Sequence, residues 1–186
     1  MITGIVLASG YSSRMGENKL LLLKDNNPMI EHLFIQLYKI KFHEVIVVTQ
    51  YIEIEKIARS YGYTVVTNHK PQNGISESIK LGVENTDTDS NFMFFTGDQP
   101  FLTSEVIEKI IENSNSHQVV VPRVSGKNKS PVIFGKTYRK ELLKLTGDIG
   151  GKEIIKNNLD NIKYVNFSDE NDFLDIDTWE EYEKIR

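Results

Sequence analysis

The sequence predicts an α/β fold in three layers, in which a mixed, mostly parallel sheet is flanked by helices on both sides. Short runs rich in β-branched and aromatic residues alternate with amphipathic stretches along residues 2–113, which is typical of successive βαβ units. Two of these runs, residues 45–48 and 92–95, are apolar throughout, as central strands covered by helices on both faces must be. The second half is less regular, which favours a mixed sheet over a purely parallel one.

The individual elements follow from the same patterns. In the first half we expect strands at residues 2–8, 44–49, 64–67 and 91–96, and helices at 29–41, 52–61, 76–84 and 104–113. The first helix should begin beside Pro28, because proline is favoured at a helix start. In the second half we expect strands at residues 118–122, 131–134 and 162–167, with a polar loop at 123–130 and a hairpin on the substrate side. No repeat or change of composition divides the chain, so residues 1–186 should form a single domain.

Composition excludes several classes of protein. The chain has no cysteine, so a metal would be a hard ion held by oxygen or one bound by imidazole. Its net charge of −4 argues against binding along a nucleic-acid backbone, which requires a basic face. No run of apolar residues is long enough to cross a membrane, and the N-terminal run is too short for a signal peptide. We therefore expect a cytoplasmic protein that binds neither membranes nor nucleic acid.

The most informative segment is residues 5–19, where an apolar run ends at Gly10 and a loop of small residues follows. Arg14 and Lys19 lie five residues apart in this segment. Backbone amides, a guanidinium and an ammonium together suit the polyphosphate of a nucleoside triphosphate. The spacing matches neither a Walker A motif nor G-x-G-x-x-G. The alternative is a solvated glycine turn that happens to carry two cations.

Asp98 comes just after the apolar run at residues 91–96, where open α/β sheets place their ligands. A carboxylate at this point can hold Mg²⁺ together with substrate phosphates, although it can equally form a turn or cap a helix. The other acidic candidate is Asp177, which precedes a helical pattern and would also serve as a cap.

Two glycine-containing segments could bind anions or nucleotide. Gly74 allows close backbone approach before a helix, and Ser76 and Ser78 could either cap that helix or contact a nucleobase and ribose. Residues 147–152 form either an anion nest in front of Lys152 or a C-cap joined to the next helix. The four histidines show no paired spacing and are read as surface or packing residues.

Five motifs, at residues 7–22, 73–79, 97–100, 147–152 and 175–178, together resemble the signature of nucleotidyltransferases of the molybdenum-cofactor type. The resemblance spans nearly the whole chain and implies a Rossmann-like fold of the GT-A nucleotidyltransferase type. It also implies roles for individual residues. The nucleotide would be bound by Leu7, Ala8, Ser9, Gly10, Arg14, Lys19, Gly74 and Ser76, and the metal by Asp98 and Asp177. The catalytic residues would be Arg14, Lys19 and Asp98. The acceptor would be bound by Gly150, Gly151 and Lys152.

Within this family the chain resembles the MocA-like cytidylyltransferase branch more than the MobA guanylyltransferase branch. It departs from the pattern at Ser9 and at residues 127–131. The resemblance implies transfer of CMP from CTP to the phosphate of a molybdopterin-type cofactor, with release of pyrophosphate and with Mg²⁺ or Mn²⁺ as cofactor. The alternatives are use of GTP, a sugar phosphate or other small phosphate as acceptor, and a non-catalytic carrier that delivers finished cofactor to a molybdoenzyme. Each enzymatic reading requires Arg14, Asp98 and Asp177 to meet at one crevice.

Overall fold

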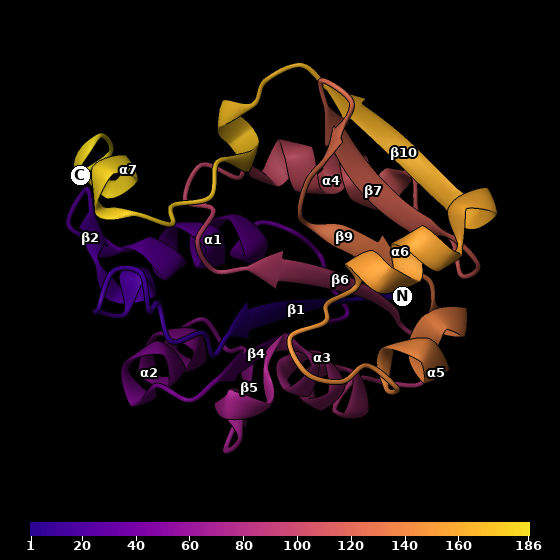
Figure 1. The fold of residues 1–186 in the computed structure, drawn as a ribbon, viewed down its shortest axis with the longest axis horizontal. Coiled ribbons are helices and arrows are strands. Elements are labelled where there is room, and N and C mark those ends of the chain that lie inside the picture. The colour runs from indigo at the N-terminus through magenta and orange to yellow at the C-terminus, as the bar shows by residue number, and fades with distance from the viewer.

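The computed structural model describes residues 1–186 and contains one large sheet and one small one (Figure 1). The strands of the large sheet are β1 (Ile2–Ala8), β4 (Glu44–Thr49), β5 (Thr64–Thr67), β6 (Asn91–Thr96), β7 (Val119–Val124), β8 (Lys127–Asn128), β9 (Val132–Phe134) and β10 (Ile162–Phe167). They lie in the order β10-β7-β9-β6-β1-β4-β5, and β8 pairs with β7. The small sheet pairs β2 (Leu23–Lys24) with β3 (Asn27–Pro28).

The pairing confirms a mixed, mostly parallel sheet. β1 is central and runs parallel to both β4 and β6, β4 is parallel to β5, and β10 is parallel to β7. The antiparallel strands are β9, between β6 and β7, and the short β8. Because β1 and β6 are parallel neighbours, their carboxyl ends meet at the same edge of the sheet, where α/β proteins bind ligands.

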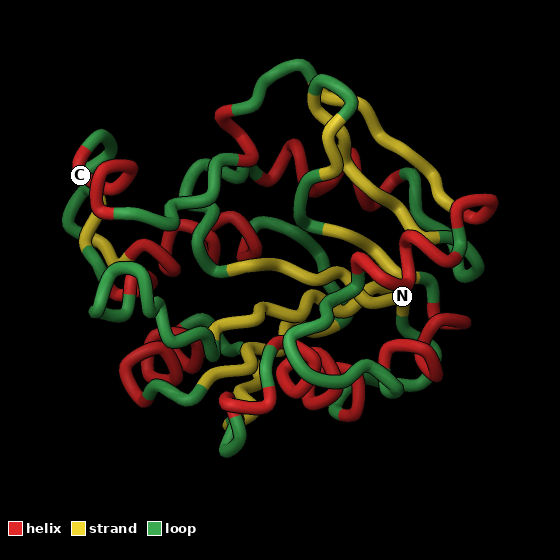
Figure 2. Tube along the Cα trace, viewed as in Figure 1, coloured by secondary structure: helices red, strands yellow, loops and turns green.

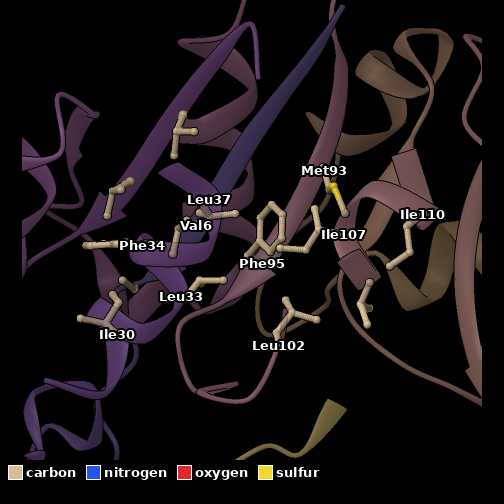
Figure 3. Packing of buried hydrophobic residues seen from close by; sticks show 14 of the residues in the cluster. Val6, Ile30, Leu33, Phe34, Leu37, Met93, Phe95, Leu102, Ile107 and Ile110 are labelled. Carbon is tan, nitrogen blue, oxygen red and sulfur yellow. The ribbon is translucent and has the colours of Figure 1, made fainter. Parts of the chain in front are cut away.

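Helices cover both faces of the sheet and complete the three layers. They are α1 (Met29–Tyr38), α2 (Ile52–Ser60), α3 (Ile75–Glu84), α4 (Ser104–Glu112), α5 (Arg139–Leu142), α6 (Lys152–Asn157) and α7 (Trp179–Glu183). One core cluster joins α1, α2 and α4 to one face, as Figure 3 shows around Val6 and Phe95. A second cluster joins α3, α5 and α6 to the other face around Ile5. Since neighbouring residues of a strand point to opposite faces, Ile5 and Val6 serve different clusters.

Short 3-10 helices lie at Lys19–Leu21, Pro71–Asn73, Lys136–Tyr138, Leu159–Asn161 and Asn171–Phe173. Loops follow the carboxyl ends of β1 and β6, on the side of the molecule where α7 lies (Figure 2). None of the helices has both the length and the apolar composition needed to cross a membrane.

One expectation was wrong in the second half. Residues 123–130 do not form a continuous loop, because β7 extends to Val124 and turns back into β8. The turn uses Ser125 and Gly126, whose φ angles are 49° and 78°. Two successive residues with positive φ form the tight turn that fits the twist of a hairpin. The Ser-Gly dipeptide was therefore the signal for this hairpin.

Candidate active site

A cavity of about 620 Å³ opens at the carboxyl ends of β1 and β6. Its walls come from segments far apart in the sequence, namely residues 7, 9–14, 19–20, 71–72, 74–75, 78 and 96–98 together with Asp148 and Asp177. This position agrees with the general rule for ligand sites in open α/β sheets. The cavity therefore brings together the first loop, the end of the most apolar strand and a segment near the C-terminus.

The end of β1 is fixed by hydrogen bonds to the end of β4 and to the segment that follows it. The Ser9 hydroxyl donates to the Val48 carbonyl at 3.1 Å, and the Gln50 side-chain amide donates to the Ser9 carbonyl at 2.8 Å. The Tyr51 hydroxyl donates to the Gly10 carbonyl at 2.9 Å. These bonds hold the start of the first loop at the cavity wall.

The charged groups of the site converge on Lys19. Its ammonium lies 2.5 Å from Asp98 Oδ2 and 2.7 Å from Asp177 Oδ1. Arg14 Nη1 lies 3.0 Å from the other oxygen of Asp177. The side chains of Lys19 and Asp98 are only 13% and 15% exposed, whereas that of Arg14 is 69% exposed. Arg14 thus reaches into solvent at the rim, and the Lys19–Asp98 pair lies deeper.

The electrostatics of the site favour the charged forms of Lys19 and Asp177. Burial alone lowers the pKa of Lys19, but the carboxylates of Asp98 and Asp177 outweigh burial and raise this pKa above its ordinary value. Partial burial alone raises the pKa of Asp177, but Lys19 and Arg14 outweigh it and hold this pKa below its ordinary value.

A backbone hydrogen bond explains how Asp177 reaches the end of β6. The amide of Ile176 donates to the carbonyl of Asp98 at 3.0 Å, so the segment after the last 3-10 helix lies alongside residue 98. The capping box of α7 then fixes Asp177 itself, because the Glu181 carboxylate accepts from the Asp177 amide at 2.8 Å. Backbone hydrogen bonds therefore bring Asp98 and Asp177 together, although the two residues are far apart in the sequence.

The oxygen atoms of the site suit a hard divalent cation. Asp98 Oδ1 is buried and has no hydrogen-bond partner, and the same is true of the nearby Thr96 hydroxyl. A buried carboxylate oxygen without a partner is costly unless a ligand completes its environment. No group of three or more acidic or histidine side chains is arranged to hold a metal ion. Two carboxylates plus substrate phosphates would satisfy Mg²⁺, which binds proteins through few protein ligands.

Asp175 is a third carboxylate near Asp98 and Asp177, and the motifs assign it no role. Desolvation of its carboxyl group and the negative charges of Asp98 and Asp177 raise its pKa to about 6. The local sequence does not predict this shift, because it depends first on burial of the carboxyl group and then on Asp98, which is 77 positions away in the sequence.

Another wall of the cavity is built from the start of α3 and the turn at residues 147–148. Gly74 has a φ of 82°, and a Cβ at this position would lie 2.5 Å from the Gly147 carbonyl oxygen. The Ser76 amide donates to that carbonyl at 3.3 Å, and the Asp148 carboxylate accepts from the Ile75 amide at 3.3 Å. The turn therefore caps the first amides of α3.

The structure does not bring Ser76 to the cavity. Its side chain is 1% exposed and its hydroxyl is buried without a partner, so Ser76 points into the protein. Two residues further along the helix, Ser78 lines the cavity, and its hydroxyl accepts from the Asn68 side-chain amide at 3.1 Å. Residues two apart face different directions on a helix, which explains why one serine replaces the other.

The remaining predicted residues divide in the same way. Leu7, Ser9 and Gly10 line the cavity, whereas Ala8 is fully buried in the core. The expected acceptor set does not line it. A Cβ on Gly151 would lie 2.6 Å from the Phe134 ring, so this glycine permits close packing of α6 on the sheet. Asp148, from the same motif, is the residue that reaches the cavity, while Gly150 and Lys152 lie beyond it.

Comparison with known proteins identifies the family of this chain. The family described as the MobA-like NTP transferase domain matches residues 4–162. The chain belongs to this family. Its membership confirms the family predicted from the motifs and makes the chain a nucleotidyltransferase, whereas the cytidylyl branch stays a prediction.

Individual relatives carry different names. A protein of Pyrococcus horikoshii named "Probable molybdenum cofactor guanylyltransferase" is 30% identical over 77% of this chain and 72% of its own length. A protein of Actinobacillus pleuropneumoniae named "3-deoxy-manno-octulosonate cytidylyltransferase 2" is 27% identical over 62% of this chain and 46% of its own length. Among solved structures, a nucleotidyl transferase from Methanothermobacter thermautotroptrophicus superposes with a TM-score of 0.86 at 22% identity, over 100% of this chain and 96% of that one. This likeness confirms the nucleotidyltransferase fold.

Proposed function

We propose that this member of the MobA-like NTP transferase family transfers CMP from CTP to the phosphate of a molybdopterin-type cofactor and releases pyrophosphate. One observation carries the proposal: Lys19 bridges Asp98 and Asp177, and Arg14 pairs with Asp177, on the wall of one cavity. Two carboxylates for a divalent ion and two cations for a triphosphate are what nucleotidyl transfer requires.

The reaction needs alignment and charge compensation more than covalent catalysis. An oxygen of the acceptor phosphate forms a bond to the α-phosphorus, the bond from that phosphorus to the bridging oxygen breaks, and pyrophosphate leaves with the electron pair. Arg14, which is largely exposed at the rim, would bind the outer phosphates, and Lys19 would offset charge on the leaving group. Asp98 and Asp177 would hold Mg²⁺ or Mn²⁺, which supplies further neutralisation of the phosphate oxygens when bound.

Ser78 supports CTP as the donor. Its hydroxyl oxygen accepts from Asn68, so its own proton remains available to an acceptor atom in the cavity. The Watson–Crick edge of cytosine offers two such acceptors, O2 and N3, whereas guanine presents N–H donors over most of the corresponding edge. The motifs that resemble the cytidylyltransferase branch support the same choice.

GTP is the second candidate, and Asp148 is the observation in its favour. Its carboxylate lines the cavity and accepts from the Ile75 amide through one oxygen, which leaves the other oxygen as an acceptor. Guanine N1–H and its 2-amino group would suit that acceptor. Relatives named as guanylyltransferases point in the same direction.

The test is pyrophosphate release with each of the four nucleoside triphosphates in MgCl₂, with and without a molybdopterin-type acceptor. We expect release with CTP that depends on the acceptor and is lost in Asp98→Asn. Preference for GTP would select the second candidate, and release with sugar phosphates in place of the pterin would overturn the acceptor. Binding of finished cofactor without any pyrophosphate release would favour the carrier function and refute catalysis.

A further inference from the structure

The loop at residues 11–17 carries Arg14 but has few bonds of its own. Within it, the amides of Met15 and Gly16 donate to the Ser12 carbonyl at 2.9 and 3.2 Å. The Arg14 side chain extends into solvent, and its ion pair with Asp177 is partly exposed. Exposed ion pairs contribute little to stability, so this pair is a weak anchor. The position of the loop must depend on contacts with another element.

That element is α7, which lies beside β2 at the edge of the molecule in Figure 1. The Trp179 indole N–H donates to the Met15 carbonyl at 2.9 Å, one residue after Arg14. The Met15 side chain is 5% exposed and packs in a small cluster with Ile176 and Tyr182. The cluster also contains Met29 of α1, so this buried methionine docks the loop on α7 and its neighbours.

The same helix fixes the partner of Arg14. The Glu181 carboxylate accepts from the amides of Asp177 and Thr178 at 2.8 and 2.9 Å, which holds Asp177 at the start of α7. One five-residue helix therefore holds both partners of the Arg14–Asp177 ion pair, one through its capping box and the other through its indole.

We propose that Trp179 is a positioning residue that clamps the loop at residues 11–17 to α7 and so places Arg14 for the triphosphate. The clamp is a property of the free protein. Its effect on nucleotide binding rests on the proposed function.

Hydrogen exchange measured by mass spectrometry tests the clamp without any ligand. Trp179→Phe retains an aromatic ring against Tyr182, whose ring centroid lies 5.8 Å away, but loses the N–H. The matched control is Tyr182→Phe, which removes a different hydrogen bond of α7, from the Tyr182 hydroxyl to the Leu23 carbonyl of β2 at 2.7 Å. We expect faster exchange at residues 11–17 in Trp179→Phe alone, with β1 and β4 unchanged. Unchanged exchange at residues 11–17, or equal acceleration in the control, would overturn the clamp.

A double-mutant cycle on binding of CTP and GTP in MgCl₂ tests whether Trp179 affects nucleotide affinity through Arg14. Loss of one hydrogen bond corresponds to roughly 3- to 10-fold in an equilibrium constant, so Trp179→Phe should weaken binding by up to about 10-fold. In the Arg14→Ala background the same change should have almost no effect. Additive losses would refute positioning through Arg14. If the wild type binds neither nucleotide while exchange changes as expected, the proposed function fails and the clamp stands.

Discussion

Replacement of Gly74 by alanine should disturb both the stability of the protein and the cavity wall at the start of α3. Gly74 combines a φ of 82° with a ψ of −175°, a region of backbone conformation that is almost restricted to glycine. In addition, the new Cβ would lie 2.5 Å from the Gly147 carbonyl oxygen and 2.7 Å from the Asp148 amide nitrogen. These neighbours are backbone atoms, so they cannot move aside as the end of a side chain can.

The expected cost is the sum of these two effects. Backbone strain of this kind costs about 1–3 kcal/mol, and forced displacement of packed atoms costs about 1–3 kcal/mol more. We therefore expect the free energy of unfolding to fall by about 2–6 kcal/mol in urea denaturation. Because the displaced turn caps α3 and carries Asp148, we also expect nucleotide affinity to fall by about 10-fold, measured by calorimetric titration.

Gly62→Ala is the matched control, because Gly62 has a similar φ of 77° but no atom within 4 Å of the added Cβ. It should cost only about 1–2 kcal/mol, the cost of the left-handed backbone alone, with no change in affinity. Equal losses of stability in the two variants, together with unchanged nucleotide affinity in Gly74→Ala, would refute the role given to the contact with Gly147.

Three further predictions concern the charged cluster. Asp98→Asn should lower the rate of pyrophosphate release by about 10²–10³, because it removes one preorganised charged group, while the circular dichroism spectrum stays that of the wild type. Lys19→Ala should weaken binding of the triphosphate more than that of the nucleoside monophosphate, since its partners Asp98 and Asp177 then carry uncompensated charge; equal weakening of both in titrations would contradict this. Asp175→Asn should change how stability depends on pH. The pKa of Asp175 is raised to about 6, so ionisation of its carboxyl group destabilises the native state as the pH rises from about 4 to 6. In urea titrations the variant should therefore be more stable than the wild type above about pH 6, with no such gain below about pH 4.

Most of the sheet could be predicted because its signals are local. Apolar runs mark β4 and β6 as covered on both faces, and the segments after β1 and β6 carry the motifs of the site. Helix ends were less accurate. The helix expected to reach residue 41 ends at Tyr38, since helical periodicity does not mark the last turn. The β7–β8 hairpin was missed because β8 is only two residues long and both residues are polar and exposed, so no alternating pattern marks it.

The residues that line the cavity could be predicted where they lie at the end of a strand. They were harder to predict where the orientation of a helix decides which side chain faces the cavity. Asp98 and Gly10 follow strands and face the cavity as expected. Ser76 and Ser78 share one motif, but only the rotation of α3 against the sheet decides which of them is exposed to the cavity. Asp148 reaches the cavity in place of Lys152, because close packing of Gly151 on Phe134 directs α6 toward the sheet.

The parts of the site differ in how firmly the fold holds them. Asp98 follows a central strand and is placed by the sheet, whereas Asp177 is held by one backbone hydrogen bond from Ile176 to Asp98 and by the Glu181 carboxylate of α7. Arg14 lies on an exposed loop that is held by hydrogen bonds near its two ends, by the Trp179 indole of α7, and by the Met15 side chain, which packs in a cluster with Met29 and Tyr182. A bound triphosphate needs the cations and the metal ligands in place at the same time. The accuracy with which the site is aligned is therefore limited by Arg14, which is held less firmly than the carboxylates. Substitution of Trp179, which bonds to the loop and not to Asp177, should therefore affect Arg14 before it affects the carboxylates.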